Sequence, residues 1–174
     1  TDEDIGWSVQ QTSNGGYILA GETELRAGDN DAWLIKTDTN GNMLWNKTYG
    51  GSAADNGYNV IKTSDGGFAL LGVTASSGAG GNDFWLIKTD ASGAVLWSKT
   101  YGGNASDSGM AVIQTTDGGY TIAGITSSFG AGGIDGWLFK TDAAGIMQWN
   151  KTVGGLGTDY ALHMLKTMDG GYII

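Results

Sequence analysis

Two sets of aspartates recur at a fixed spacing and form the clearest pattern of ionisable side chains in the sequence. The sets are Asp31, Asp83 and Asp135, and Asp55, Asp107 and Asp159; members of a set are 52 residues apart. Such carboxylates could accept hydrogen bonds from backbone N–H groups in turns, or hold a cation such as Ca²⁺ together with loop carbonyls. They could also form a catalytic pair, as in glycoside hydrolysis. A catalytic pair needs two different environments, so identical copies favour the turn interpretation and leave Ca²⁺ as the alternative.

Few other side chains suggest catalysis. The 174 residues include no Cys and a single His, His163. The lack of Cys excludes a disulfide scaffold, a zinc ribbon and thiol catalysis, and one His disfavours a Ser-His-Asp triad. We therefore predict that the chain is not an enzyme and has no cofactor apart from the Ca²⁺ alternative. His163 stands where the other units have Ser8, Asn59 and Ala111, and we expect a packed or hydrogen-bonded inner-strand residue.

The net charge of −9 argues against two classes of partner. Nucleic acids and anionic membrane surfaces attract basic proteins, so neither is expected to bind here. No apolar run approaches the roughly 20 residues that span a bilayer, so membrane insertion is not expected either.

A repeat of about 52 residues organises the whole chain. The phrase Thr-x-Asn/Asp-Gly-Gly-Tyr/Phe begins at Thr12, Thr63, Thr115 and Thr167. Two tryptophan columns keep a spacing of 52, namely Trp33, Trp85 and Trp137, and Trp45, Trp97 and Trp149. We divide the single segment 1–174 into units 1–51, 52–103 and 104–155 and a partial unit 156–174.

Each unit is expected to form four short strands. In the second unit they are 58–62, 68–73, 84–89 and 95–101, separated by Asp-Gly and Asp-x-x-Gly turns and a Gly-rich loop. The strands are short apolar runs rich in aromatic and β-branched residues, which is typical of strands covered on both faces. Four antiparallel strands per unit predict an all-β fold of β-propeller blades, about 3.5 in this chain. The tryptophan columns would then pack between adjacent blades.

The hairpins 37–45, 89–97 and 141–149 run from Thr-Asp through a turn Gly to Trp. They resemble the tryptophan-docking hairpin of quinoprotein-like (PQQ-like) propeller repeats, although the Asp-to-Gly turn is one residue shorter here. The full unit also resembles Gly-rich propeller repeats of secreted and cell-surface proteins of archaea and bacteria. The resemblance implies that the first strand of each unit is innermost and the Trp45-type strand outermost. It does not imply quinone binding.

Alternating strand direction places the long Gly-rich loops and the connections between units on one edge of the fold, here called the loop rim. Twelve of the 18 acidic residues fall on it, including both aspartate sets, and Arg26 is the only basic residue there. We expect a non-catalytic scaffold or recognition module, extracellular or on a cell surface, that contacts a glycan or protein through this acidic rim.

The partial unit leaves an apolar strand edge to be covered. The expected cover is another copy of the chain or the rest of a longer propeller. A purely structural, self-assembling propeller is the alternative function, and a hydrolase is a less favoured one.

Overall fold

The computed structural model describes residues 3–26 and 29–174, apart from the side chains of residues 25 and 26. Regular structure in these ranges consists of β-strands, which confirms the all-β class. Asp2, one of the twelve acidic residues assigned to the loop rim, and the side chain of Arg26 lie outside the described residues. Within the described ranges we find no helix that is long and apolar enough to cross a membrane.

The strands form three four-stranded antiparallel sheets and one hairpin, each in sequence order. Sheet 1 contains β1 (Asp4–Gln11), β2 (Tyr17–Arg26), β3 (Asp29–Thr37) and β4 (Met43–Tyr49). Sheet 2 contains β5 (Asp55–Lys62), β6 (Phe68–Thr74), β7 (Asp83–Thr89) and β8 (Val95–Tyr101). Sheet 3 contains β9 (Asp107–Gln114), β10 (Tyr120–Thr126), β11 (Asp135–Thr141) and β12 (Met147–Val153). The hairpin pairs β13 (Leu165–Lys166) with β14 (Tyr172–Ile173).

The repeated Thr-x-Asp-Gly-Gly phrase forms the turn between the first two strands of each unit. In unit 2, Asp65 Oδ1 accepts hydrogen bonds from the Thr63 hydroxyl at 2.6 Å and from the backbone N–H of Gly67 at 3.1 Å. Gly66 has a φ of 86°, a conformation that side chains with a Cβ rarely adopt. The turn chemistry therefore fixes where each first hairpin reverses.

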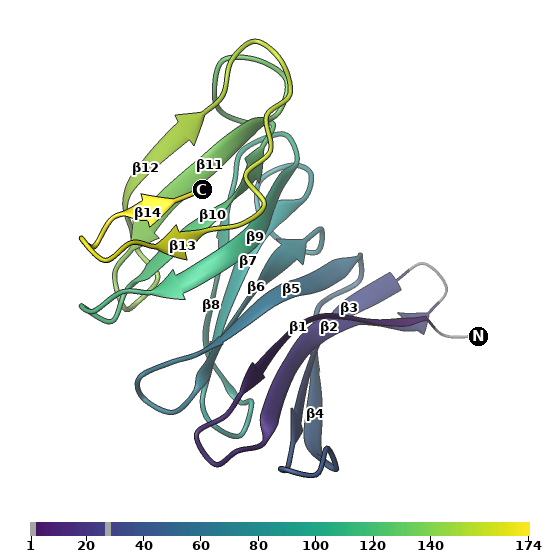
Figure 1. Cartoon of the computed structure of the whole chain (residues 1–174). Coiled ribbons are helices and arrows are strands. Elements are labelled where there is room, and N and C mark those ends of the chain that lie inside the picture. The colour runs from purple at the N-terminus through teal and green to yellow at the C-terminus, as the bar shows by residue number, and fades with distance from the viewer. Residues whose placement is uncertain (1–2, 27–28) are drawn as a thin grey trace.

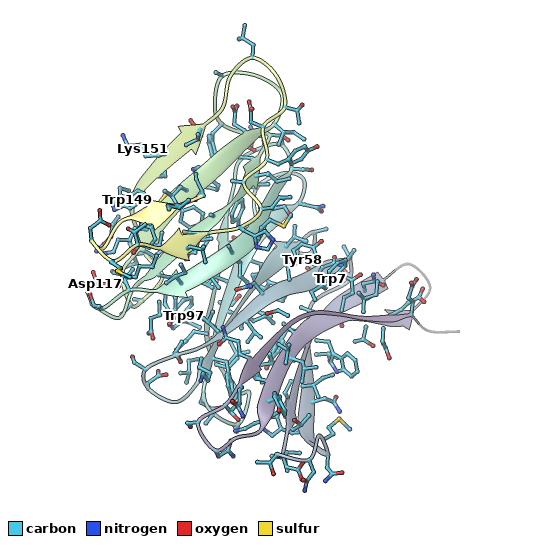
Figure 2. The ribbon with its side chains drawn as sticks, viewed as in Figure 1. Trp7, Tyr58, Trp97, Asp117, Trp149 and Lys151 are labelled. Carbon is cyan, nitrogen blue, oxygen red and sulfur yellow. The ribbon has the colours of Figure 1, made fainter. Side chains whose placement is uncertain are left out.

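The first strand of every complete sheet carries a β-bulge at the same place. Pairing skips one residue in each case: Trp7 in sheet 1, Tyr58 in sheet 2 and Met110 in sheet 3. An extra residue in one strand increases the local twist and redirects the side chains around it. Trp7 and Tyr58 meet edge to face with their ring centroids 5.8 Å apart (Figure 2).

Apolar side chains fill the space between consecutive sheets. One buried cluster joins Ile18 and Leu34 of sheet 1 to Leu70 and Ile87 of sheet 2. A second joins sheets 2 and 3, and a third joins sheet 3 to Met164, just before β13. Sheet 2 is thus covered on both faces, which explains why all seven residues of β6 are buried.

The sheets follow one another as an open array, from sheet 1 in purple to the terminal hairpin in yellow (Figure 1). The first strands β1, β5 and β9 contact one another in that order. The fourth strands β4 and β12 lie at the outer edges of the same view. Each unit therefore places its first strand on the inner side of the array.

Candidate functional site

Four of the six repeated aspartates are buried at the first residue of a strand. Asp55 and Asp107 begin β5 and β9, and Asp83 and Asp135 begin β7 and β11. Each is at most 1% exposed. The carboxylates at these four positions therefore do not add to an exposed acidic surface on the loop rim. Of the remaining two, Asp31 is half-buried in β3 and Asp159 is exposed.

Asp107 shows what these carboxylates do. Its Oδ2 accepts hydrogen bonds from the backbone N–H of Gly103 at 2.8 Å and from the Ser128 hydroxyl at 2.6 Å. Its Oδ1 accepts from the Thr126 hydroxyl and from the backbone N–H of Ser128 at 3.3 Å. Four hydrogen-bond donors therefore replace the water that this carboxyl group loses on burial.

The same bonds recur one unit earlier. Asp55 Oδ2 accepts from the backbone N–H of Gly51 and from the Ser76 hydroxyl, both at 2.7 Å. In the final unit Asp159 Oδ2 accepts from the N–H of Gly155 at 2.8 Å. The second aspartate set thus bonds the backbone of the turn four residues before it, which is the first of the three interpretations offered above.

Asp83 and Asp135 are in a different environment. Asp83 Oδ2 accepts a hydrogen bond from the N–H of Ala79 at 2.7 Å, and Asp135 Oδ2 accepts from the N–H of Ala131 at 3.0 Å. Their Oδ1 atoms are buried and have no hydrogen-bond donor among the described residues. Burial, and secondarily the charge of Asp107, raises the pKa of Asp83. This carboxyl is thus favoured in its neutral form over a wider pH range than an exposed aspartate.

The two aspartate sets meet at a glycine on the boundary between units. A Cβ on Gly102 would overlap Asp83 Oδ1 and would lie 2.8 Å from Asp107 Oδ2. Gly50 occupies the equivalent place between the first two units, and Gly154 does so in the third unit. Glycine is required because its missing side chain leaves room for both carboxylates. The Gly102 boundary therefore pairs Asp107, which accepts bonds at both carboxylate oxygens, with Asp83, which accepts a bond at Oδ2 only.

The described residues contain no group of three His, Cys, Asp or Glu side chains arranged to hold a metal ion. Each glycine boundary brings together two carboxylates, fewer than the six to eight oxygen ligands that Ca²⁺ takes. Loop carbonyls and water would have to supply most of the coordination, so Ca²⁺ binding stays a prediction.

The Trp45-type column lies between consecutive sheets. Trp45 meets Phe68 of sheet 2 edge to face, with the ring centroids 6.1 Å apart. Trp97 meets Tyr120 of sheet 3 in the same way, with the ring centroids 5.8 Å apart. Trp149, the third member, is 38% exposed on β12 (Figure 2). The column is therefore covered where a complete sheet follows and more open on sheet 3.

The Trp33-type column differs between units in its hydrogen bonds. Trp85 Nε1 donates to the Ser98 hydroxyl at 2.7 Å, and Trp137 Nε1 donates to Asn150 Oδ1 at 3.3 Å. Trp33 and Trp85 are half-buried, whereas Trp137 is buried in the cluster between sheets 2 and 3.

A hollow in the described structure runs along the inner strands rather than over the aspartates. This groove has a volume of about 650 Å³. The polar residues that line it include Gln10, Asn59, Lys62, Gln114, His163 and Lys166. They come from β1, β5, β9 and the segment around β13, so every unit contributes. We call this the inner-strand groove.

Sequence reasoning missed this groove as a candidate site. The expectation that His163 is packed or hydrogen-bonded is wrong, because its side chain is exposed and lines the groove. Lys62 and Lys166 occupy the same repeat position in units 2 and 4, with Gln114 between them in unit 3. That alternation was a signal in the sequence, but only the arrangement of the inner strands shows that these residues share one hollow.

Comparison with known proteins adds no named relative. A scan against protein-family models gives no match, and a search of curated proteins gives no significant match. Functional conclusions therefore depend on the geometry of this chain.

Proposed function

We propose that the chain is a segment of a β-propeller that acts as a non-catalytic scaffold and presents the loop rim to a binding partner. In this proposal each four-stranded sheet is one blade, and the partial fourth unit is the inner half of another. Support comes from the docking contacts between consecutive sheets, which repeat at the spacing of the sequence repeat. The resemblance to propeller repeats of secreted proteins favours a place outside the cell or on its surface.

The observation that carries the proposal is the anchoring of the long rim loops by buried aspartates. In the 75–82 loop, Asp55 bonds the Ser76 hydroxyl at 2.7 Å and Asp83 bonds the N–H of Ala79 at 2.7 Å. Residues 75–82 are themselves exposed. An exposed loop held by buried bonds loses little conformational entropy when a partner binds, which favours a recognition surface. The aspartates thus support recognition by shaping the loops rather than by touching the partner.

A glycan array, followed by calorimetry with Ca²⁺ present and absent, tests this proposal. We expect a glycan to bind and the Ala79→Trp variant, which adds a bulky side chain to the exposed loop, to weaken that binding. Ala144→Trp, in an exposed turn on the opposite edge of sheet 3, is the matched control. Equal loss in the two variants would contradict recognition by the rim.

Self-association through the last unit is the second candidate function. Apolar side chains there are strongly exposed, with Leu156 at 90% and Leu165 at 70%. Patches of this kind mark interaction surfaces in soluble proteins. Native mass spectrometry of the wild-type chain and of Leu165→Glu checks it: we expect an oligomer that the variant dissociates, and a monomeric wild type would rule it out.

A further inference from the structure

The inner-strand groove has a charge opposite to that of the whole protein. The chain carries 18 acidic and 9 basic residues. None of the described residues that line the groove is acidic, whereas Lys62, Lys166 and His163 all line it. Two lysines that line one hollow of an otherwise acidic protein would concentrate small anions there.

The two groove lysines are also available for a ligand. The ion pairs found among the described residues use Lys88, 2.9 Å from Asp65, and Lys140, which contacts Asp117. Lys62 and Lys166 are exposed and form no ion pair within the described ranges. Asp65 is close to Lys62 in sequence, but its carboxylate is committed to Lys88 and to its own turn.

Amide side chains in the groove are held in place by the neighbouring inner strand. Gln10 Oε1 accepts a hydrogen bond from the backbone N–H of Lys62 at 3.2 Å, and Gln114 Oε1 accepts from the N–H of Ser64 at 2.8 Å. These bonds occupy the carbonyl ends and leave the NH₂ end of Gln10 as an available donor, whereas the NH₂ of Gln114 already donates one hydrogen bond, to the carbonyl of Gly118 at 3.4 Å, and keeps one further N–H. The fixed groups of the groove are therefore mostly hydrogen-bond donors, which match the oxygens of an anion.

A second hollow of about 470 Å³ shares Lys62, Thr63 and Ser64 with the first. It adds Lys36 and Asn14 and again has no acidic residue among its described lining. Asn14 stands at the turn position that Asp65, Asp117 and Asp169 hold in the other units. The exchange of a carboxylate for an amide in this one turn removes a negative charge from the edge of the hollow.

We propose that the inner-strand groove binds a small organic oxyanion that also carries hydroxyl groups, such as a sugar acid or a sugar phosphate. Lys62 lies where the two hollows join and contacts the anionic group, together with Lys166 or His163. The amides of Gln10 and Asn59 and the hydroxyl of Ser64 bind the sugar hydroxyls. This site is separate from the loop rim, so it does not depend on rim recognition or on closure of a ring.

Titration calorimetry at low ionic strength tests the proposal with four probes: glucuronate, glucose 6-phosphate, inorganic phosphate and glucose. We expect at least one of the two sugar anions to bind more tightly than inorganic phosphate, and glucose to give no signal. Binding of glucuronate alone would identify a carboxylate as the anionic group, and binding of glucose 6-phosphate alone would identify a phosphate. Added salt should weaken binding because it screens the lysines.

Matched variants locate the site. Lys62→Gln keeps the length of the side chain and introduces a residue that Gln114 already supplies at the equivalent position, so the fold should tolerate it. It should weaken binding about tenfold, as expected for loss of a hydrogen bond to a charged group. Lys151→Gln removes one charge from the exposed outer strand β12 and should leave affinity unchanged (Figure 2). No binding of either sugar anion at 10 mM, or equal weakening by both variants, would overturn the proposal.

Discussion

The hydroxyl of Tyr101 donates a hydrogen bond of 2.7 Å to the backbone carbonyl of Gly145, 44 residues later in the chain. Tyr49 makes the same bond to the carbonyl of Gly93, also at 2.7 Å. Each bond joins the last strand of one sheet to the outer hairpin turn of the next. Val153 holds the corresponding position in unit 3, where no hydroxyl is present.

The Tyr101 bond should contribute measurably to stability. Tyr101 is 8% exposed, and burial raises its pKa, with the nearby charge of Asp142 as a second cause. Tyr101→Phe leaves the Gly145 carbonyl without this donor and should lower the free energy of unfolding by about 1–2 kcal/mol. Tyr49→Phe removes the equivalent bond at a more exposed site and should cost less. Urea denaturation of both variants checks the order; a larger loss for Tyr49→Phe would contradict it.

Gly102→Ala should be among the most destabilising small substitutions in the chain. The added Cβ overlaps Asp83 Oδ1, which is itself buried, so the backbone or the aspartate must move. Overpacking of this kind costs about 1–3 kcal/mol. Gly155→Ala is the control, because its Cβ would meet no atom within 4 Å. Thermal unfolding of both variants measures the difference, and comparable midpoints would show that the boundary can relax around the added methyl group.

Asp83→Asn and Asp107→Asn should differ in their effects on the free energy of unfolding. Asp107 accepts bonds from four donors, so an amide NH₂ would face at least one donor and should cost about 1–3 kcal/mol. At Asp83 the NH₂ can occupy the Oδ1 position, which faces the Asp107 carboxylate and has no described donor. We therefore expect Asp83→Asn to be neutral or stabilising at pH 7.

The pH dependence of the free energy of unfolding tests the environment of Asp83. The pKa of Asp83 is raised in the folded state, so the folded protein keeps a proton that the unfolded chain releases above about pH 4. The contribution of Asp83 to stability is therefore complete below that pH and decreases as pH rises through the raised pKa. Asp83→Asn should remove this decrease. Unfolding free energies measured from pH 4 to pH 8 test it, and parallel curves for the variant and the wild type would contradict the assignment.

Trp97→Ala should destabilise the protein more than Trp149→Ala. Trp97 packs on the cluster between sheets 2 and 3 and meets Tyr120 edge to face, whereas Trp149 is 38% exposed. Removing a well-packed tryptophan costs about 3–5 kcal/mol. Calorimetric unfolding of both variants gives the comparison, and an equal shift in midpoint would mean that the two indoles contribute equally.

The sequence predicted the strands closely because the repeat and the turn chemistry are both local signals. In unit 2 the expected strand 95–101 matches β8, and the expected strand 58–62 is the later part of β5. β5 starts earlier because Asp55 bonds the preceding turn and brings residues 55–57 into register with β6. A polar residue at a strand start is difficult to distinguish from a loop residue in sequence alone.

The candidate sites were harder to predict because they depend on side-chain direction. The alternation of strand direction predicted that the aspartates lie on the loop rim, but it did not predict how deeply their carboxylates are buried. The carboxylates of Asp55 and Asp107 turn inward to the N–H groups of Gly51 and Gly103. The inner-strand groove combines residues as far apart as Gln10 and Lys166. A single sequence does not specify such long-range proximity, even where the repeat positions are known.

The apolar layers on both faces of sheet 2 also determine how the protein opens. Sheet 1 and the terminal hairpin each pack against the array through one described apolar layer, so either can detach at a cost of one interface. Sheet 2 can separate only when two interfaces break. Local unfolding should therefore proceed inward from both ends, and the amide protons of β6 should be the last to exchange with solvent.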